Sequence, residues 1–405
     1  MKPVWLNHYP PGVPATVDTA RFASLVDLFE QSCRKFRDKP AFTSLGTTLT
    51  YVETDKLSRD FAAYLQALGL KPGERVAIML PNLLQYPVAL FGILRAGLIA
   101  VNVNPLYTAR ELQHQLADSG AVAIVVLENF AHTLQEIIGD TAIRHVVTTQ
   151  IGDLFAPVKR CLINFAVKHV KRMVPRWHLT GAMAFNAALK SGAAKTFTPV
   201  TVTREDIAFL QYTGGTTGVA KGAVLTHGNL VANVEQTSAW IGIKFTEGEE
   251  VIVTPLPLYH IFALTANLLT FVRWGANNVL IANPRDLPAF IKELRRTRFT
   301  AMTGVTTLYR LLLDAPDFAK VKTANGDALK VAVAGGMALH PAVAERWQAL
   351  MGVPLIEGYG LTEASPIVCA NPMNITGFTG SIGLPLPSTE ILLRGEDGRE
   401  VAPGE

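Results

Sequence analysis

The feature that most constrains this chain is the stretch YTGGTTGVAKGAVLTH, Tyr212 to His227, with four glycines, four threonines and a lysine between two β-like runs. The residues before it read as an apolar strand, and an amphipathic helix is predicted from Asn229. Glycines let backbone N–H groups approach oxyanions closely, while threonine hydroxyls add donors and a lysine adds charge. We therefore interpret the stretch as a loop that holds phosphate groups. The residues assigned to it are Thr213, Gly214, Gly215, Thr216, Thr217, Gly218, Lys221 and Gly222.

Two other interpretations fit the residues of this stretch less well. It is not a Walker A loop, because the chain has no Gly-Lys pair followed by Ser or Thr, and no GxGxxG follows the first strand candidate. The other is a flexible Gly/Thr linker, but linkers are rarely flanked by two apolar strands with a lysine at the end. Phosphate binding is the interpretation that explains the composition.

A second group of motifs lies far downstream. The run EGYGLTEASP spans Glu357 to Pro366, and GSIGLPLPSTE follows at Gly380 to Glu390. Together with the phosphate loop, and in this order, they resemble the signature motifs of the adenylate-forming superfamily, which includes acyl-CoA synthetases, luciferases and the adenylation domains of peptide synthetases. PLPLYHIFALT, Pro255 to Thr265, and VAGGMALHPAVAERW, Val333 to Trp347, are similar to bacterial long-chain fatty acyl-CoA ligases. The resemblance covers nearly the whole chain.

The resemblance implies a two-step activation of a long-chain fatty acid. A carboxylate is a poor acyl donor, because its leaving group would be oxide. In the implied mechanism the carboxylate attacks the α-phosphorus of ATP, pyrophosphate departs, and the thiol of coenzyme A then displaces AMP from the acyl adenylate. The expected ligands are a fatty acid, ATP, Mg2+ and coenzyme A as co-substrate, because phosphoryl transfer depends on positioning and electrostatics.

The same resemblance implies roles for single residues. Tyr359 is similar to the tyrosine that stacks on adenine, Thr362 to a threonine that touches the α-phosphate, and Glu363, with Thr216, to residues that help to hold magnesium. A half-buried tyrosine capping a strand is the plain alternative for Tyr359, and a strand-to-helix turn equally explains the neighbouring glycines. The implied adenine site is Gly335, Gly336, Gly358 and Tyr359. The implied catalytic set is Lys221, His260, Thr362 and Glu363.

His260 follows an apolar strand in PLYH, and the resemblance places it beside the carboxylate and the α-phosphate. Taken alone, a histidine near apolar residues is more often structural. The apolar runs Ile261 to Val272 and Thr300 to Tyr309 are the expected acyl channel by resemblance, although either run is also compatible with ordinary core. The residues assigned to this tunnel are Ala263, Leu264, Thr303, Gly304 and Val305.

Length and composition agree with a large α/β enzyme. A chain of 405 residues that is 49% hydrophobic can bury a substantial core. The net charge of +4 gives no case for nucleic acid, and three distant cysteines fit neither a disulfide framework nor a zinc site. The N-terminus lacks an apolar signal-peptide region, and the most apolar stretch, Val88 to Val103, contains Arg95 and is too short to cross a membrane. The expected location is the cytoplasm, with peripheral contact at the inner face of the membrane.

Strand and helix patterns alternate along the chain and predict two stacked α/β subdomains with mostly parallel sheets. Buried strands are expected at 75–80, 98–103 and 121–127, and Thr108 with Glu111 forms a capping-box pattern between the last two. Later strands are expected near 250–254, 278–282, 300–305, 330–334 and 354–356. The predicted subdomains are residues 1–200, with an insertion near 153–195, then 201–385, and the start of a β-rich subdomain at 386–405.

The segment from Leu154 to Trp177 has a character of its own. It carries six basic residues and no acidic one, and Leu162, Phe165, Val170 and Met173 fit one apolar face. A basic amphipathic helix is typical of docking on an anionic membrane surface, and a solvated helix packed on the protein is the alternative.

The resemblance also predicts family elements that this sequence does not contain after Glu405, so we expect a fragment with weak or no activity of its own. A ligase that passes its acyl adenylate to a carrier protein would share every motif, and a non-catalytic acyl- or nucleotide-binding module is a further alternative. A hydrolase is disfavoured, because no GxSxG elbow or clustered Cys–His pair supplies a nucleophile. A homodimer stays open, since one sequence does not distinguish an exposed apolar patch from core.

Overall fold

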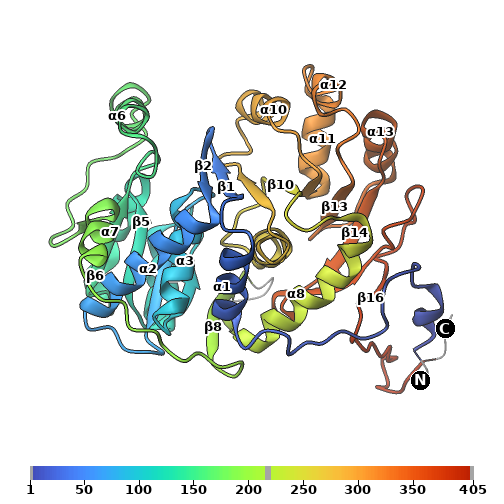
Figure 1. Ribbon diagram of the computed structural model, residues 1–405, viewed down its shortest axis with the longest axis horizontal. Helices are drawn as coiled ribbons and strands as arrows, with labels where there is room; N and C mark the ends of the chain where they lie inside the picture. Colours follow the sequence, from blue (N-terminus) through green and yellow to red (C-terminus); the bar gives the residue numbers. More distant parts are fainter. Residues whose placement is uncertain (1–2, 215–219, 402–405) are drawn as a thin grey trace.

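The computed structural model describes residues 3–214 and 220–401, and they form two α/β units that stand side by side (Figure 1). One unit is built on a nine-stranded sheet and the other on a seven-stranded sheet, and both sheets are mostly parallel. The expectation of two stacked α/β subdomains with mostly parallel sheets is therefore confirmed.

The nine-stranded sheet has the order β16-β15-β14-β13-β12-β10-β11-β1-β2. Pairing is parallel from β14 through to β1 and antiparallel at both edges. Its strands are β1 (Pro40–Ser44), β2 (Thr47–Thr50), β10 (Val251–Thr254), β11 (Asn277–Leu280), β12 (Ala301–Gly304), β13 (Val331–Gly335), β14 (Leu355–Gly360), β15 (Ile367–Ala370) and β16 (Leu384–Pro385).

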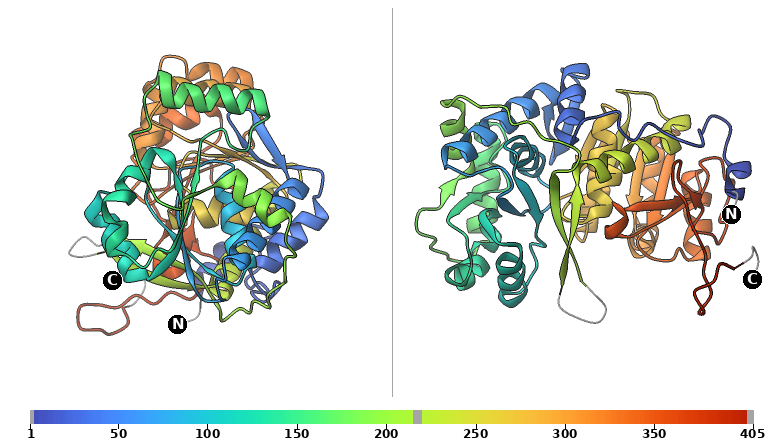
Figure 2. Two further views of the ribbon diagram at one scale, coloured as in Figure 1. Left: turned by 90° about the vertical axis from the view of Figure 1, so that its left-hand side faces the viewer. Right: turned by 90° about the horizontal axis from the view of Figure 1, so that it is seen from below.

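The seven-stranded sheet has the order β7-β6-β5-β3-β4-β8-β9. All of its pairs are parallel except the hairpin β8–β9, which Figure 2 shows between the two units. Its strands are β3 (Arg75–Met79), β4 (Ile99–Asn102), β5 (Ala121–Leu127), β6 (His145–Thr149), β7 (Met183–Ala184), β8 (Ile207–Thr213) and β9 (Lys221–Thr226).

Helices cover both sheets and connect most of the parallel strands, as parallel pairing requires. The α-helices are α1 (Leu25–Lys35), α2 (Tyr51–Ala67), α3 (Gln85–Arg95), α4 (Ala109–Ser119), α5 (Ala131–Ile137), α6 (Pro157–Phe165), α7 (Phe185–Ala193), α8 (His227–Ile241), α9 (Thr270–Arg273), α10 (Leu287–Arg296), α11 (Thr306–Asp314), α12 (Ala319–Asn325) and α13 (Pro341–Met351). Short 3-10 helices are η1 (Val4–His8), η2 (Glu128–Phe130), η3 (Ile138–Asp140), η5 (Gly242–Lys244) and η7 (Thr362–Ala364). Two π-helical segments are η4 (Ala166–Val170) and η6 (Ala263–Leu269).

Local signals in the sequence explain several of these boundaries. The side chain of Thr108 accepts from the backbone N–H of Glu111, whose carboxylate accepts from the backbone of Thr108, so the predicted capping box starts α4. The apolar stretch 88–103 is the wholly buried helix α3 and strand β4. No helix in residues 3–214 or 220–401 is both long and apolar enough to cross a bilayer.

The two sheets exchange segments across the predicted subdomain boundary at residue 200. Strand β1 pairs with β11, so residues near 40 join the sheet of the later unit. Strand β8 pairs with β4, so residues 207–213 extend the earlier one. The segment 153–195 adds β7 to the edge of the seven-stranded sheet and packs α7 on α2. The predicted subdomain boundaries therefore stay a prediction, because strands from both sides of residue 200 take part in each sheet.

Candidate active site

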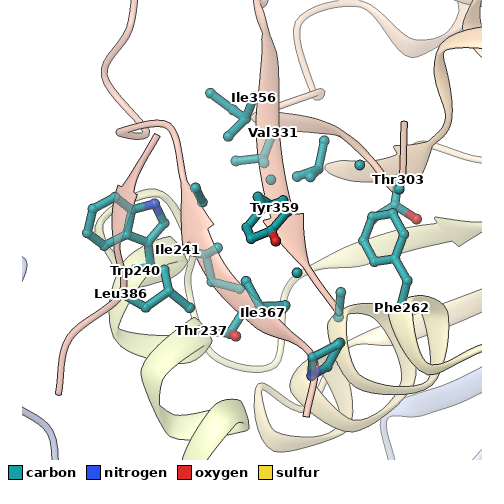
Figure 3. A pocket seen from close by; sticks show the side chains of 18 of the residues that line it. Thr237, Trp240, Ile241, Phe262, Thr303, Val331, Ile356, Tyr359, Ile367 and Leu386 are labelled. Atoms are coloured by element: carbon teal, nitrogen blue, oxygen red, sulfur yellow. The ribbon is translucent and has the colours of Figure 1, made fainter. Parts of the chain in front are cut away.

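A cavity of about 280 Å3 opens at the carboxyl ends of β12, β13 and β14. It extends along these strands, with α8 and the π-helix η6 supplying other walls, as Figure 3 shows. Gly335 and Tyr359 lie at its carboxyl end, whereas Val331 and Ile356 lie nearer the amino ends of their strands. Ligands of parallel α/β sheets typically bind at this carboxyl edge.

The residues predicted to surround adenine gather at the mouth of this cavity. Gly335, Gly336, Gly358, Tyr359 and Thr362 all line it. A Cβ on Gly335 would lie 3.1 Å from both the Gly358 carbonyl oxygen and the Phe262 ring, and Gly336 has a φ of +74°. The ring of Tyr359 is 46% exposed and therefore has a free surface on which a base can stack.

The described phosphate-loop residues do not line the cavity, but the hairpin that carries them contacts η7, whose Thr362 does. Thr213 ends β8, and Gly214 follows as an exposed residue. The predicted phosphate ligands Gly215, Thr216, Thr217 and Gly218 lie outside the described residues. Lys221 begins β9, and this strand contacts the short helix η7, which carries Glu363. A lysine and a carboxylate from motifs far apart in the sequence are thus brought to neighbouring elements.

Gly222 has a packing reason of its own. A Cβ at this position would lie 3.0 Å from the ring of Tyr212 on the paired strand. The Tyr212 hydroxyl donates to Asp118 at 2.5 Å. Gly222 therefore lets the aromatic ring of β8 lie flat over β9 and fixes the hairpin that carries the loop.

His260 lies at the cavity wall between Tyr259 and the start of η6. Its Nδ1 accepts a 3.3 Å hydrogen bond from the backbone N–H of Phe262. The neutral ring consequently carries its proton on Nε2, which has no other hydrogen-bond partner among the described residues. Desolvation lowers the pKa of His260 below its ordinary value, although part of the ring is exposed. At neutral pH His260 therefore presents a neutral N–H donor.

The apolar part of the cavity differs in detail from the predicted tunnel. Thr303 lines it, but Ala263, Leu264, Gly304 and Val305 are not among the lining residues. Ala263 and Leu264 are fully buried in the core, and Tyr309 packs against Gly304. Phe262, which precedes the π-helix, and Ala266, within it, line the cavity instead. Residues four apart lie on one face of a helix, and Ala263 and Leu264 lie on other faces, which are buried in the core.

The two runs expected to form the channel supply part of the apolar wall, including Ala266, Phe271 and Ala301. Sequence reasoning missed the rest, which comes from α8, from the following turn, from β13 and from strands on both sides of it. These further lining residues are Trp240, Ile241, Phe245, Ile252, Val331, Ile356, Ile367, Met373 and Leu386. The Trp240 Nε1 donates to the Asn371 carbonyl at 3.0 Å, which holds the indole in place. Apolar residues on α8 were visible in the sequence directly after the phosphate loop, but the pattern alone does not show which of them face the cavity.

Of the two residues predicted to hold magnesium, Glu363 is the one that the structure describes. Among the described residues, no group of three or more His, Cys, Asp or Glu side chains could hold a metal ion. Glu363 is exposed and makes no hydrogen bond or ion pair with the described residues. A single free carboxylate fits Mg2+, which proteins often bind through one or two carboxylates together with the phosphates of the substrate.

The predicted amphipathic segment turns its apolar face outward. Val158, Leu162 and Phe165 recur at helical spacing along α6, and all three are exposed. Polar contacts hold the other side of the helix, because the Asn164 Oδ1 accepts from the backbone N–H of Gly152 at 2.8 Å and Lys159 donates to Thr47 at 3.0 Å. The helix stands at the periphery, at the upper left of Figure 1.

Comparison with known proteins agrees with this site. Residues 29–405 match the family model described as AMP-binding enzyme. The long-chain-fatty-acid–CoA ligase of Salmonella typhimurium is 54% identical, across 100% of this chain and 72% of the relative. The enzyme of the same name from Bacillus subtilis is 32% identical, across 98% of this chain and 70% of its own length.

Solved structures show the same architecture. A long-chain-fatty-acid–CoA ligase from Archaeoglobus fulgidus superposes with a TM-score of 0.79 at 23% identity, covering 98% of this chain and 76% of that one. An anthranilate CoA ligase in complex with anthranoyl-AMP superposes with a TM-score of 0.82 at 22% identity, covering 96% and 70%. The family match and the identity to the curated ligases together show that this chain belongs to the AMP-binding, adenylate-forming enzymes, alongside the long-chain-fatty-acid–CoA ligases.

Proposed function

We propose that this chain activates long-chain fatty acids as acyl adenylates for transfer to coenzyme A. The observation that carries the proposal is a single cavity whose mouth is formed by the nucleotide motifs and whose inner walls are apolar. A nucleotide and an acyl chain bound in one continuous space would place the carboxylate next to the α-phosphate. The curated relatives are named for this activity, which uses ATP and coenzyme A.

In the first step the carboxylate oxygen attacks the α-phosphorus and pyrophosphate leaves, which gives a mixed anhydride. In the second step the thiol of coenzyme A attacks the acyl carbonyl, loses its proton, and AMP leaves. Both anionic reactants must approach each other in the first step. A donor placed between them lowers this repulsion, because hydrogen bonds to developing charge are strong in a site that excludes water.

His260 is the residue that we assign to this task. Its Nε2 proton is free to donate, because Nδ1 already accepts from the backbone of Phe262. A neutral donor suits the site, since it orients the carboxylate without forming a tight ion pair that would reduce its nucleophilicity. The role predicts that loss of the imidazole weakens acyl-adenylate binding more than nucleotide binding.

The phosphate side is assigned to the hairpin and to η7. Thr213 to Lys221, with Gly222, would surround the β- and γ-phosphates, while Thr362, at the cavity, would contact the α-phosphate. Glu363 and Thr216 are assigned to Mg2+, which would neutralise phosphate charge when bound. The exposed, unpaired carboxylate of Glu363 supports this assignment.

Calorimetric titration with non-hydrolysable acyl-adenylate mimics tests the proposal. Affinity should rise with acyl length, by about fourfold per methylene when each contributes about 0.8 kcal/mol. Adenosine alone should bind weakly and serves as the control. An affinity that is independent of acyl length would contradict a joint nucleotide and acyl site.

We also propose that α6 and η4 contact an anionic membrane, from which a long-chain acid can be delivered. Five apolar residues between Leu154 and Trp177 are 49–75% exposed, namely Val158, Leu162, Phe165, Val170 and Met173. Six basic residues and no acidic one lie in the same stretch. The whole chain carries only +4, so the rest of the molecule is slightly acidic. Exposed apolar groups bordered by cations are the combination that binds anionic lipid surfaces.

Vesicle sedimentation provides the test for this contact. Replacing Lys168, Lys171, Arg172 and Arg176 with Gln should weaken binding to anionic vesicles by up to about 4 kcal/mol, at about 1 kcal/mol per cation. A matched control removes four cations elsewhere. These are Lys292, Arg295, Arg296 and Lys320, which line a surface pocket at α10 and α12. Unchanged sedimentation of the first variant, or an equal loss in the control, would contradict the assignment.

A further inference from the structure

The loop that carries His260 is held by side chains of the other α/β unit. It runs from Thr254, the last residue of β10, to His260, and it contains two prolines that offer no N–H groups. Its other backbone groups must find partners, because the surrounding residues are buried. The partners come from the turn between β3 and α3, from the start of α3 and from β8, all of which belong to the seven-stranded sheet and its cover.

Asn82 makes three of these contacts. Its Nδ2 donates to the carbonyl oxygens of Thr254 at 2.9 Å and Leu256 at 2.8 Å. Its Oδ1 accepts from the backbone N–H of Leu258 at 2.8 Å. The side chain is only 3% exposed, so a lost hydrogen bond would not be replaced readily by water. The side-chain amide of Asn82 therefore holds the backbone at every second residue from Thr254 to Leu258.

A second set of contacts reaches the residue before His260. The Gln211 Nε2 donates to the carbonyl oxygen of Tyr259 at 2.7 Å, and its Oε1 accepts from Asn102 Nδ2 at 3.0 Å. The Tyr86 hydroxyl lies 2.8 Å from both Asn102 Oδ1 and the Leu258 carbonyl oxygen. The amide and phenol groups of this set are buried and form one connected network.

Gln211 lies two residues before Thr213, in the strand that leads into the phosphate loop. The network therefore connects two parts of the proposed site that are separate in the sequence: the strand before the phosphate loop and the loop before His260. Neither Asn82 nor Gln211 lines the cavity. Their contribution would act through the position of His260 and not through contact with substrate.

We propose that Asn82 and Gln211 are positioning residues that set His260 relative to the phosphate loop. Gln211 is connected through Asn102 and Tyr86 to the Leu258 carbonyl oxygen, and Asn82 accepts from the Leu258 N–H. This inference rests on the proposed role of His260. A different reason for the network would be the general satisfaction of buried backbone groups. The two explanations differ in what they predict for a variant that loses one contact but stays folded.

Gln211→Met is the main test, because it keeps side-chain length and removes the donor to Tyr259. Gln85→Met is the matched control. Gln85 is also fully buried and its Nε2 donates to a carbonyl oxygen at 2.7 Å, but that oxygen belongs to Gln150, which follows β6 and is not part of the His260 loop. We expect Gln211→Met to lower the affinity of the 405-residue chain for a long-chain acyl-adenylate mimic by about tenfold, and Gln85→Met to leave it unchanged.

A double-mutant cycle with His260→Ala separates positioning from general stability. If Gln211 acts through His260, Gln211→Met should have little further effect on mimic affinity once the imidazole is absent. Asn82→Leu should behave in the same way, and it lies farther along the sequence from the phosphate loop. Equal losses in the presence and absence of the imidazole, or equal losses in Gln85→Met, would overturn the proposal.

The ring of His260 gives a readout that does not require the mimic to bind. Its pKa can be followed by NMR titration of the free chain, with the signal assigned by its loss in His260→Ala. We expect Gln211→Met and Asn82→Leu to move this pKa, whereas Gln85→Met should not. If the wild-type chain showed no acyl dependence, the proposed function would fail while this titration still tested the network. An unchanged pKa in both variants would refute positioning.

Discussion

Enlarging a residue at the inner end of the cavity should shorten the acyl chain that the protein binds well. Ala301 on β12 lines the cavity and pairs in register with Val331, four residues before Gly335 on β13. Four strand residues span about 13 Å. A fully extended polypeptide advances about 1.2 Å per backbone bond, and an extended acyl chain should advance by a similar length. An acyl tail would therefore need about eleven bonds to reach Ala301 from the level of Gly335.

The substitution Ala301→Leu adds three carbon atoms at this depth. If they displace three methylenes of the ligand, each worth about 0.8 kcal/mol, the loss is about 2.4 kcal/mol, or about 60-fold in affinity. This loss should appear for a tetradecanoyl-adenylate mimic and not for a hexanoyl mimic, which does not reach Ala301. Isothermal calorimetry on both mimics gives the comparison.

The control is Ala332→Leu on the adjacent strand. Ala332 is fully buried but packs in a different core cluster and does not line the cavity. Overpacking should destabilise both variants by about 1–3 kcal/mol, and thermal melts would show whether the two are comparable. An equal loss for the short and the long mimic in Ala301→Leu would mean that the cavity does not hold the acyl chain.

Three further predictions follow from the structure. Burial lowers the pKa of His227 to about 4, so the unfolded chain gains a proton below pH 6.5 while the folded chain stays neutral. The free energy of unfolding should therefore fall by about 1.6 kcal/mol from pH 6.5 to 5. In urea titrations His227→Asn should lose this slope, because an amide oxygen can replace Nδ1 as acceptor for Leu25, whereas His340→Asn on the surface should keep it. His260→Ala should weaken an acyl-adenylate mimic by about tenfold and adenosine by less than about twofold, and equal losses would speak against a role at the carboxylate. Leu162→Ser with Phe165→Ser should reduce sedimentation with anionic vesicles, and Leu311→Ser, another exposed apolar residue, is the control.

The strands and helices followed closely from local sequence. The predicted strand at 121–127 is β5, and those at 75–80, 98–103 and 330–334 match β3, β4 and β13 within one or two residues. Runs of β-branched residues bounded by turns determine such strands without reference to the rest of the chain. The glycine motifs could also be recognised from the sequence. Gly335 and Gly336 occupy positions where a side chain would collide with its neighbours or strain the backbone.

The apolar wall of the cavity could not be predicted from the sequence in the same way. The sequence assigned Ala263, Leu264, Thr303, Gly304 and Val305 to the channel. Thr303 lines the cavity, whereas Ala263 and Leu264 are buried in the core. The walls also include Trp240 of α8 and Met373 after β15, which no motif connects. Contacts between elements that are distant in the sequence depend on how the sheets pack, and local periodicity carries no record of that.

The sequence by itself determined the order of elements, the nucleotide motifs and the family, because these depend on residue types at fixed spacing. Only the tertiary structure decided which residues meet. It exchanged β1 and β8 between the two sheets, joined the nucleotide motifs to an apolar cavity, and bound the His260 loop to Asn82 and Gln211. It also left the apolar face of α6 in solvent, where an amphipathic pattern alone would equally predict a helix packed inward. The physical reason is that burial and hydrogen bonding between distant segments are properties of the packed chain.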